Sequence, residues 1–150
     1  MSIEPAEHAR LHGYVRALAQ VSDIDECELL AHVLSDPNRA MSDSAVIGHL
    51  DRRAAALCDD ASFIAWSQWI ARVLDGHQLP ERRLREWSLL NEIDSGRPWN
   101  TAYLIEVSDW LQRRLAERTD SRQALTALAN QGRTNRIRNT ARTRLVHQPT

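Results

Sequence analysis

The chain has 150 residues, of which 43% are hydrophobic and 26% are charged, and its formal net charge is −1. This balance predicts one packed domain over residues 1–150 and argues against an intrinsically disordered chain. No apolar run is long enough to cross a membrane, and the acidic first residues lack the apolar segment of a signal peptide. Two cysteines are too few for a disulfide scaffold, so we expect a cytoplasmic protein.

Apolar residues recur with helical spacing along the whole chain, and sustained strand alternation is absent from the sequence. The pattern predicts an all-α fold of about eight short antiparallel helices stacked as hairpins, because short links favour antiparallel neighbours. The predicted helices span residues 4–20, 23–35, 43–57, 61–74, 80–95, 101–118, 122–130 and 135–145. The helix within 1–20 either packs on this stack or stays peripheral, and the tail 146–150 should fray.

Residues with capping side chains precede most of the predicted helices, and single glycines follow three of them. The expected N-terminal caps are Ser22, Ser42 or Asp43, Asp59 or Asp60, Asn100, Ser121 and Thr134, and the expected stops are Gly76, Gly96 and Gly132. The helical stripes predict inward-facing side chains that include Leu11, Val15, Leu18, Phe63, Trp66, Trp69, Ile70, Val73, Leu84, Trp87, Leu90, Ile93, Tyr103, Val107, Trp110 and Leu111.

The last two predicted helices carry a pattern that resembles a HEAT-type helical repeat. Ile137, Arg138, Ala141 and Leu145 stand in the order apolar, arginine, small and leucine that the second helix of such a repeat often shows. The resemblance implies an α-solenoid-type stack that serves as a binding scaffold. One branch, the HEAT-like alkylpurine DNA glycosylases, binds DNA on an arginine-rich face lined with tryptophan, but no motif here transfers a catalytic residue from it.

Charge is distributed unevenly: residues 1–60 carry a net −6, residues 61–120 carry −1 and residues 121–150 carry +6. Every basic residue except histidine is an arginine, the side chain best suited to bidentate contacts with carboxylates and phosphates. The cluster that points to an anion-binding surface consists of Arg133, Arg136, Arg138, Arg142 and Arg144. Its alternatives are an acidic protein surface, nucleic acid, a solvated terminal face, or pairing with the acidic first third of the chain.

Four of the five tryptophans fall at or beside inward-facing helical positions, where core packing is the expected role. Trp99 differs because it follows Arg97 and Pro98 in a predicted loop. We therefore consider Trp99 and Arg97 as an interaction anchor, against the alternative that Trp99 folds back as a plug.

Catalytic, metal and cofactor signals are weak. Glu4, His8 and His12 are spaced four residues apart, but a polar helix face explains them better than a metal site, and we predict no metal. Cys27 and Cys58 fall beside apolar stripes that include Ala31, and neighbouring carboxylates should raise their thiol pKa, so we expect inert thiols. No nucleophile elbow or phosphate-binding glycine loop is present, so we assign no catalytic residue and no cofactor.

The sequence therefore favours a non-catalytic interaction module that presents a basic C-terminal helical face to an acidic protein or to a second copy, head to tail. Two alternatives stay open. The first is a HEAT-like nucleic-acid-binding protein, which needs Arg82, Arg83 and Arg85 to share a face with the C-terminal cluster. The second is a small helical enzyme of unnamed chemistry. A membrane partner is not expected.

Overall fold

In the computed structural model, which describes residues 5–57 and 61–149, every regular element is a helix and none of these residues lies in a strand. The predicted all-α fold class is therefore confirmed. The helices of the described residues are α1 (Pro5–Gln20), α2 (Glu26–Leu34), α3 (Arg39–Leu57), α4 (Ser62–Leu74), α5 (Gln78–Asp94), α6 (Tyr103–Glu106), α7 (Asp109–Arg118), α8 (Arg122–Gln131) and α9 (Asn135–His147). Among them, no helix combines the length and apolar character needed to span a bilayer.

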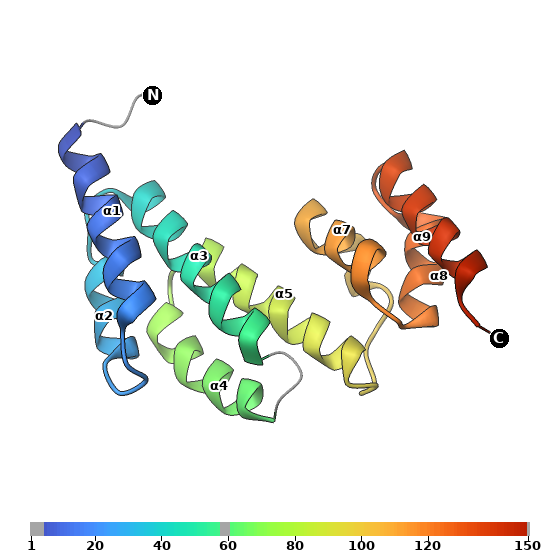
Figure 1. Cartoon of the computed structure of the whole chain (residues 1–150), viewed down its shortest axis with the longest axis horizontal. Coiled ribbons are helices and arrows are strands. Elements are labelled where there is room, and N and C mark those ends of the chain that lie inside the picture. Colours follow the sequence, from blue (N-terminus) through green and yellow to red (C-terminus); the bar gives the residue numbers. More distant parts are fainter. Residues whose placement is uncertain (1–4, 58–60, 150) are drawn as a thin grey trace. The chain divides into compact units, whose positions relative to one another are not determined.

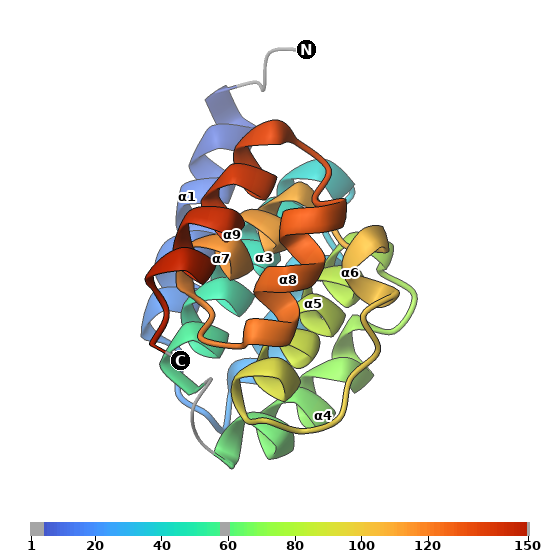
Figure 2. The ribbon, with the colours of Figure 1, turned by 90° about the vertical axis from the view of Figure 1, so that its right-hand side faces the viewer.

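The residue contacts divide the chain into an N-terminal unit, residues 1–87, and a C-terminal unit, residues 88–150, with the boundary inside α5. In the N-terminal unit, α1 packs against α2 and α3, and α4 packs against the same two helices (Figure 1). In the C-terminal unit, α8 packs against α6, α7 and α9, and α7 also packs against α9 (Figure 2). The boundary between the units lies inside the continuous helix α5, so this division does not define two separate domains. The single domain over residues 1–150 therefore stays a prediction.

The core of each unit is built from the helical stripes that the sequence indicates. The predicted inward-facing residues that are buried are Leu18, Phe63, Trp66, Ile70, Leu84, Trp87, Leu90, Ile93 and Leu111. Burying one such side chain stabilises the fold by about 1.5–3 kcal/mol, so packing of these faces, rather than the propensity of short helices, holds the units together.

Local capping signals are confirmed where the cap and the helix start are adjacent in sequence. The hydroxyls of Ser121 and Thr134 each accept a hydrogen bond from the backbone N–H three residues later, at 3.2 and 3.1 Å. Gly76 and Gly96 follow α4 and α5 with φ of 85° and 72°, a conformation that costs glycine little. Asp59 and Asp60 lie outside the described residues.

The single helix predicted over 101–118 is wrong, because α6 ends at Glu106 and a new helix starts at Asp109. The backbones of Val107 and Ser108 are extended between the two. The Ser108 hydroxyl accepts from the backbone N–H three residues later, at 3.4 Å, so this serine acts as an N-cap that the apolar pattern hides.

Two helices begin away from their predicted caps. The Ser22 hydroxyl bonds to the carboxylate of Asp25 at 3.1 Å rather than to a backbone N–H, and α2 begins three residues later than predicted. In contrast, α3 begins four residues earlier than predicted, because the side chain of Asn38 accepts a backbone N–H at 3.1 Å. Ser42 and Asp43, the predicted caps, therefore lie inside α3.

The C-terminal tail is more ordered than the sequence predicts. Helix α9 continues to His147, so the expected fraying from residue 146 is wrong for its first two residues. The side chain of Gln148 donates to the backbone oxygen of Asp120 at 3.0 Å and fastens the end of α9 to the segment before α8.

Several side chains predicted to face inward do not. Val15, Trp69 and Tyr103 are exposed, and Val73 is half-buried while its neighbour Leu74 is fully buried. Each of these residues lies at the border of a helical stripe, where sequence spacing alone does not decide which side a neighbour covers. Helix α1 buries only Leu18, yet it packs on α2 and α3, so the first helix is part of the N-terminal unit.

A polar cluster fastens α1 to the turn between α2 and α3. The Asp36 carboxylate accepts hydrogen bonds from Arg10 at 3.0 Å, from the Tyr14 hydroxyl at 2.7 Å and from the Asn38 backbone at 2.9 Å. These three hydrogen bonds lower the pKa of Asp36 to about 2, and the bond from Arg10 has the largest effect. The hydrogen bond between Tyr14 and Asp36 raises the pKa of Tyr14.

The depressed pKa of Asp36 predicts a specific acid sensitivity. The ionised Asp36 carboxylate contributes its full stabilisation of the folded state above the ordinary aspartate pKa. We expect this contribution to be lost as the pH falls from about 4 toward about 2. Urea unfolding at several pH values should therefore show a steeper loss of stability in this window for the natural chain than for Asp36→Asn. Tyr14→Phe, which removes one donor, should give an intermediate slope, and equal slopes for all three proteins would contradict the assignment.

Candidate interaction surface

Helix α9 places the predicted arginine cluster on the surface of the C-terminal unit. Ile137 and Ala141 are buried on the side that faces α7 and α8. Because residues four apart share a helix face, Arg138 and Arg142 lie on one edge of the buried stripe, as the sequence predicts. Arg136 lies on the other side of the exposed face, so the cluster is spread around the helix and is not a single patch.

Arg133 is used inside the fold. Its guanidinium donates to the backbone oxygens of Ile105 and Val107, at 3.0 and 2.7 Å, and forms an ion pair with Asp109. Its backbone N–H donates to the Gln112 side chain at 2.9 Å. Arg133 thereby satisfies the carbonyl groups that α6 leaves free at its C-terminal end, and little of its charge is available to a partner.

Arg144 and Arg138 are also engaged within the C-terminal unit. Arg144 donates to the backbone oxygen of Ala116 near the end of α7, at 3.2 Å, and pairs with Asp120 at 3.6 Å. Arg138 bonds to the backbone oxygen of Gly132 and to the Asn135 side chain. Arg144 is thus paired with a carboxylate, whereas Arg138 has only neutral acceptors in the described part of the chain.

Arg136 and Arg142 are the two members of the cluster that extend into solvent without an acidic partner among the described residues. Within the described part of the chain, the Arg142 side chain bonds only to the side chain of Asn139, at 3.3 Å. Arg136 lines a shallow depression of about 630 Å³ on α9, together with Asn139, Thr140, Thr143 and Arg144. None of these lining residues is acidic, so this surface favours an anion.

The proposed anchor is only partly available. Trp99 is half-buried, which places it between the exposed anchor and the folded plug that the sequence leaves open. Arg97 donates to the side chain of Asn91, and its Nε is buried without a hydrogen-bond partner in the described part of the chain. Arg97 is therefore tied to α5, and the anchor role stays a prediction.

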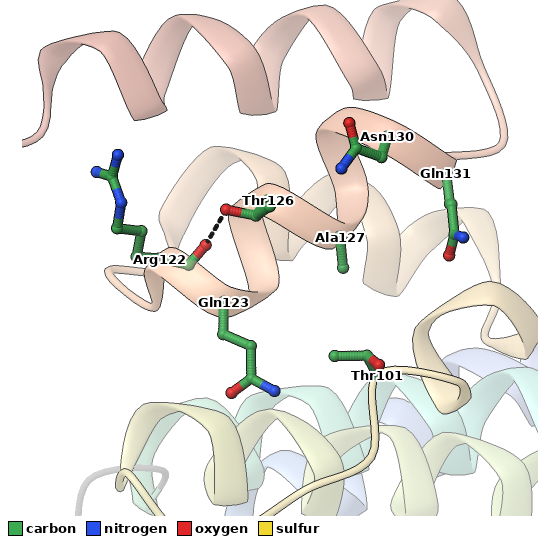
Figure 3. Close-up of a pocket in the computed structure, with 7 residues that line it drawn as sticks. All are labelled: Thr101, Arg122, Gln123, Thr126, Ala127, Asn130 and Gln131. Atoms are coloured by element: carbon green, nitrogen blue, oxygen red, sulfur yellow. Dashed lines mark hydrogen bonds between the residues drawn. The ribbon is translucent and has the colours of Figure 1, made fainter.

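A second depression, of about 520 Å³, lies beside α8, on the side where the segment with Thr101 runs (Figure 3). Gln123, Ala127 and Gln131 extend from α8 toward the side on which Thr101 lies, whereas Arg122 extends away from it. The only hydrogen bond drawn there joins the Thr126 hydroxyl to the backbone oxygen of Arg122, at 2.8 Å. The described residues that line this depression include no carboxylate, histidine or cysteine, so they offer no group for acid–base catalysis.

The N-terminal unit contains a cleft that no motif in the sequence indicates. It has a volume of about 660 Å³, and its lining includes Ile24 before α2, Cys27 in the first turn of α2, Arg53 near the end of α3, and Trp66 and Trp69 in α4. Trp69, predicted to be part of the core, is 64% exposed on its wall. The guanidinium carbon of Arg72 lies over the Trp69 ring, 5.9 Å from the ring centroid.

Glu26 lies in the lining of this cleft and is only 4% exposed. Its carboxylate bonds to His49 Nε2 at 2.6 Å, to Arg53 Nε at 3.0 Å and to the Trp66 indole nitrogen at 3.2 Å. Burial opposes ionisation of Glu26, but the hydrogen bonds of His49 and Arg53 outweigh it and lower its pKa. Glu26 thus joins α2, α3 and α4 through one carboxylate.

The predicted set of inward-facing residues omits Glu26, and that omission is wrong, because Glu26 is buried. The missed signal is its spacing, because Glu26 continues the buried stripe of Leu30, Val33 and Leu34 by one turn. The stripe assumed for Cys27 is wrong as well, since Ala31 is exposed. Cys27 itself is half-buried, and burial followed by the charge of Glu26 raises its thiol pKa, in the expected direction.

The remaining sequence candidates do not assemble into a site in the described residues. His8 and His12 are both exposed on α1, and Glu4 and Cys58 lie outside the described residues. No group of three metal-ligating side chains comes together within residues 5–57 and 61–149.

Comparisons of the chain with protein-family models, curated proteins and solved structures give no match.

Proposed function

We propose that the protein is an interaction module whose α9 surface binds an acidic segment of another protein chain. The observation that carries this proposal is the pair Arg136 and Arg142, two exposed guanidinium groups on one short helix with no carboxylate partner in the described part of the chain. Arg138, which has only neutral partners, adds a third charge on the Arg142 edge. Guanidinium groups bind carboxylates with two parallel hydrogen bonds, so aspartate and glutamate side chains are the expected ligands.

We favour a protein carboxylate over nucleic acid as the ligand, because nucleic-acid binding would need more arginines than the C-terminal cluster provides. Arg82, Arg83 and Arg85 would have to add their charge to the C-terminal cluster. Each of them instead lies beside a carboxylate, at 3.5 Å from Glu86, 3.6 Å from Asp51 and 3.9 Å from Glu81 respectively. Each of these three arginines thus has a carboxylate beside it, unlike Arg136 and Arg142, which leaves fewer unpaired arginines for the many phosphate contacts of a nucleic-acid site.

The HEAT-like resemblance and the cytoplasmic location remain part of this proposal. The pair α8 and α9 is a packed helical hairpin with Ile137 and Ala141 buried, as the second helix of a HEAT-type repeat requires. A free, half-buried Cys27 with a raised thiol pKa is compatible with a reducing compartment.

The proposal predicts a charge-specific loss of binding. A fluorescein-labelled oligoglutamate peptide should bind the natural chain at about 50 mM salt and more weakly at about 200 mM. The double variant Arg136→Gln/Arg142→Gln should bind about tenfold more weakly, because two charge-assisted contacts of up to about 1 kcal/mol each are lost. Fluorescence anisotropy measures both effects.

The matched control is Arg122→Glu, which changes the net charge by the same two units on the exposed start of α8. It should retain most of the binding if the site is on α9. Equal losses in both proteins would show a nonspecific charge effect and contradict the proposal. Tighter binding of a short DNA duplex than of the peptide, lost in the double variant, would favour the nucleic-acid alternative.

A further inference from the structure

The cleft of the N-terminal unit exposes apolar side chains that a monomer usually covers. Ile24 is 93% exposed and Trp69 is 64% exposed, and both line the cleft beside Cys27 and the buried Trp66. Exposed apolar groups gathered at one concave place are typical of a protein-binding site, and tryptophan is the side chain that contributes most often to binding energy there.

The charged side chains that line the cleft are Asp23, Glu26 and Arg53, and the most exposed of them is the carboxylate of Asp23, which restricts the partner. Asp23 lies in the lining with 86% of its side chain exposed, and its ion pair with Arg53 leaves much of the carboxylate open to solvent. Asp25 and Glu28, close by in sequence, are exposed as well. A segment that fits this cleft therefore carries an apolar side chain for Trp69 and Ile24 and a cation for Asp23.

The end of α9 has this combination of groups. Val146 is 80% exposed, the most exposed large apolar side chain of the described C-terminal unit. It lies four residues after Arg142 and therefore on the same face of the helix. Arg142 has no acidic partner among the described residues, so its charge is available beside the exposed valine.

We propose that the cleft between α2 and α4 receives the C-terminal end of α9 from a second copy of the chain. Val146 packs against Trp69 and Ile24, and Arg142 pairs with Asp23. The net charges of −6 over residues 1–60 and +6 over residues 121–150 favour this head-to-tail contact. The contact rests on the proposed function of α9, because it identifies the acidic partner of that surface. It joins two different surfaces, so each copy has one donor end and one acceptor cleft.

Sedimentation velocity of the full chain tests this contact over concentrations from about 1 µM to about 500 µM, at low and high salt. We expect a concentration-dependent increase in mass at low salt that weakens at high salt. Trp69→Ser in the cleft and Arg142→Glu/Val146→Ser on α9 should each weaken association at least tenfold. Leu79→Ser is the matched control, because Leu79 is an exposed apolar residue of the same unit that does not line the cleft.

Mixing the two variants gives the decisive result. The Trp69→Ser chain retains an intact α9 end, and the Arg142→Glu/Val146→Ser chain retains an intact cleft. Their mixture should therefore form a one-to-one complex that neither variant forms alone. A contact between identical surfaces would not be restored in this way, and that outcome would overturn the proposal, as would a natural chain that stays monomeric at low salt and high concentration.

The oligoglutamate experiment separates this contact from the function of α9. If the natural chain is monomeric but binds the peptide through Arg136 and Arg142, the acidic-partner function stands and the contact between copies is wrong. If neither binding is observed, both fail. Circular dichroism of each variant verifies that the helices are retained, so a loss of association is not caused by unfolding.

Discussion

Replacing Glu26 by alanine should lower the free energy of unfolding by about 3 kcal/mol, the lower end of the range for removing one partner of a buried ion pair. The carboxylate is 4% exposed and is bonded to His49, Arg53 and Trp66. Its loss leaves buried polar groups on α3 and α4 without their acceptor and opens a void beneath the cleft. Urea denaturation, followed by far-UV circular dichroism, measures the change.

Glu28→Ala is the control for this prediction, since Glu28 is an exposed acidic residue on the same helix. Its stability should stay within about 0.5 kcal/mol of the natural chain, as for most surface substitutions. Glu26→Gln keeps the size of the side chain and one acceptor oxygen. Its loss of unfolding free energy should therefore lie between those of Glu26→Ala and Glu28→Ala. If Glu26→Ala costs less than about 1 kcal/mol, the carboxylate does not hold the three helices together.

Gly132→Ala should destabilise the C-terminal unit by about 2 kcal/mol, because an added methyl group has no room. A Cβ at this position would lie 2.6 Å from the backbone oxygen of Leu128 and 2.7 Å from Cγ2 of Ile137. The first neighbour is main chain near the end of α8, and the second is a buried core side chain, so neither can move without loss of packing. Thermal and urea unfolding of the variant measure the effect.

The same substitution at Gly48 should act in the opposite direction. Gly48 is exposed in the interior of α3, and outside the adjacent backbone of that helix no described atom lies within 4 Å of an added Cβ. Gly48→Ala should therefore stabilise the chain by about 0.5–1 kcal/mol, through the lower conformational entropy of the unfolded state. Equal effects of the two substitutions would show that close packing at Gly132 has no energetic role.

The sequence predicted the local features of the fold well, because they depend on neighbours within one or two helical turns. The caps at Ser121 and Thr134 and the stops at Gly76 and Gly96 each involve a few consecutive residues. The break between α6 and α7 was missed because the apolar spacing continues across it, and only the bond from Ser108 to the start of α7 marks the new helix.

The candidate sites were predicted less well, because charge counted along the sequence does not show which groups pair in space. Arg133 stands 24 residues after Asp109, yet the two form an ion pair that fixes the segment before α7. Arg136 and Arg142 have no carboxylate partner among the described residues because their positions on α9 face solvent. The cleft required Trp66 and Glu26, 40 residues apart, to meet, and sequence spacing contains no such information.

The sequence by itself determined that this chain forms short amphipathic helices and that its last 30 residues carry a net positive charge with no acidic residue. Both properties follow from residue type and periodicity, which are encoded locally. Only the tertiary structure decided which charges are neutralised and which polar residues are buried. Glu26 is inside because three donors from α3 and α4 replace the water that it loses. Trp69 is outside because none of the helices described in the N-terminal unit covers that side of α4.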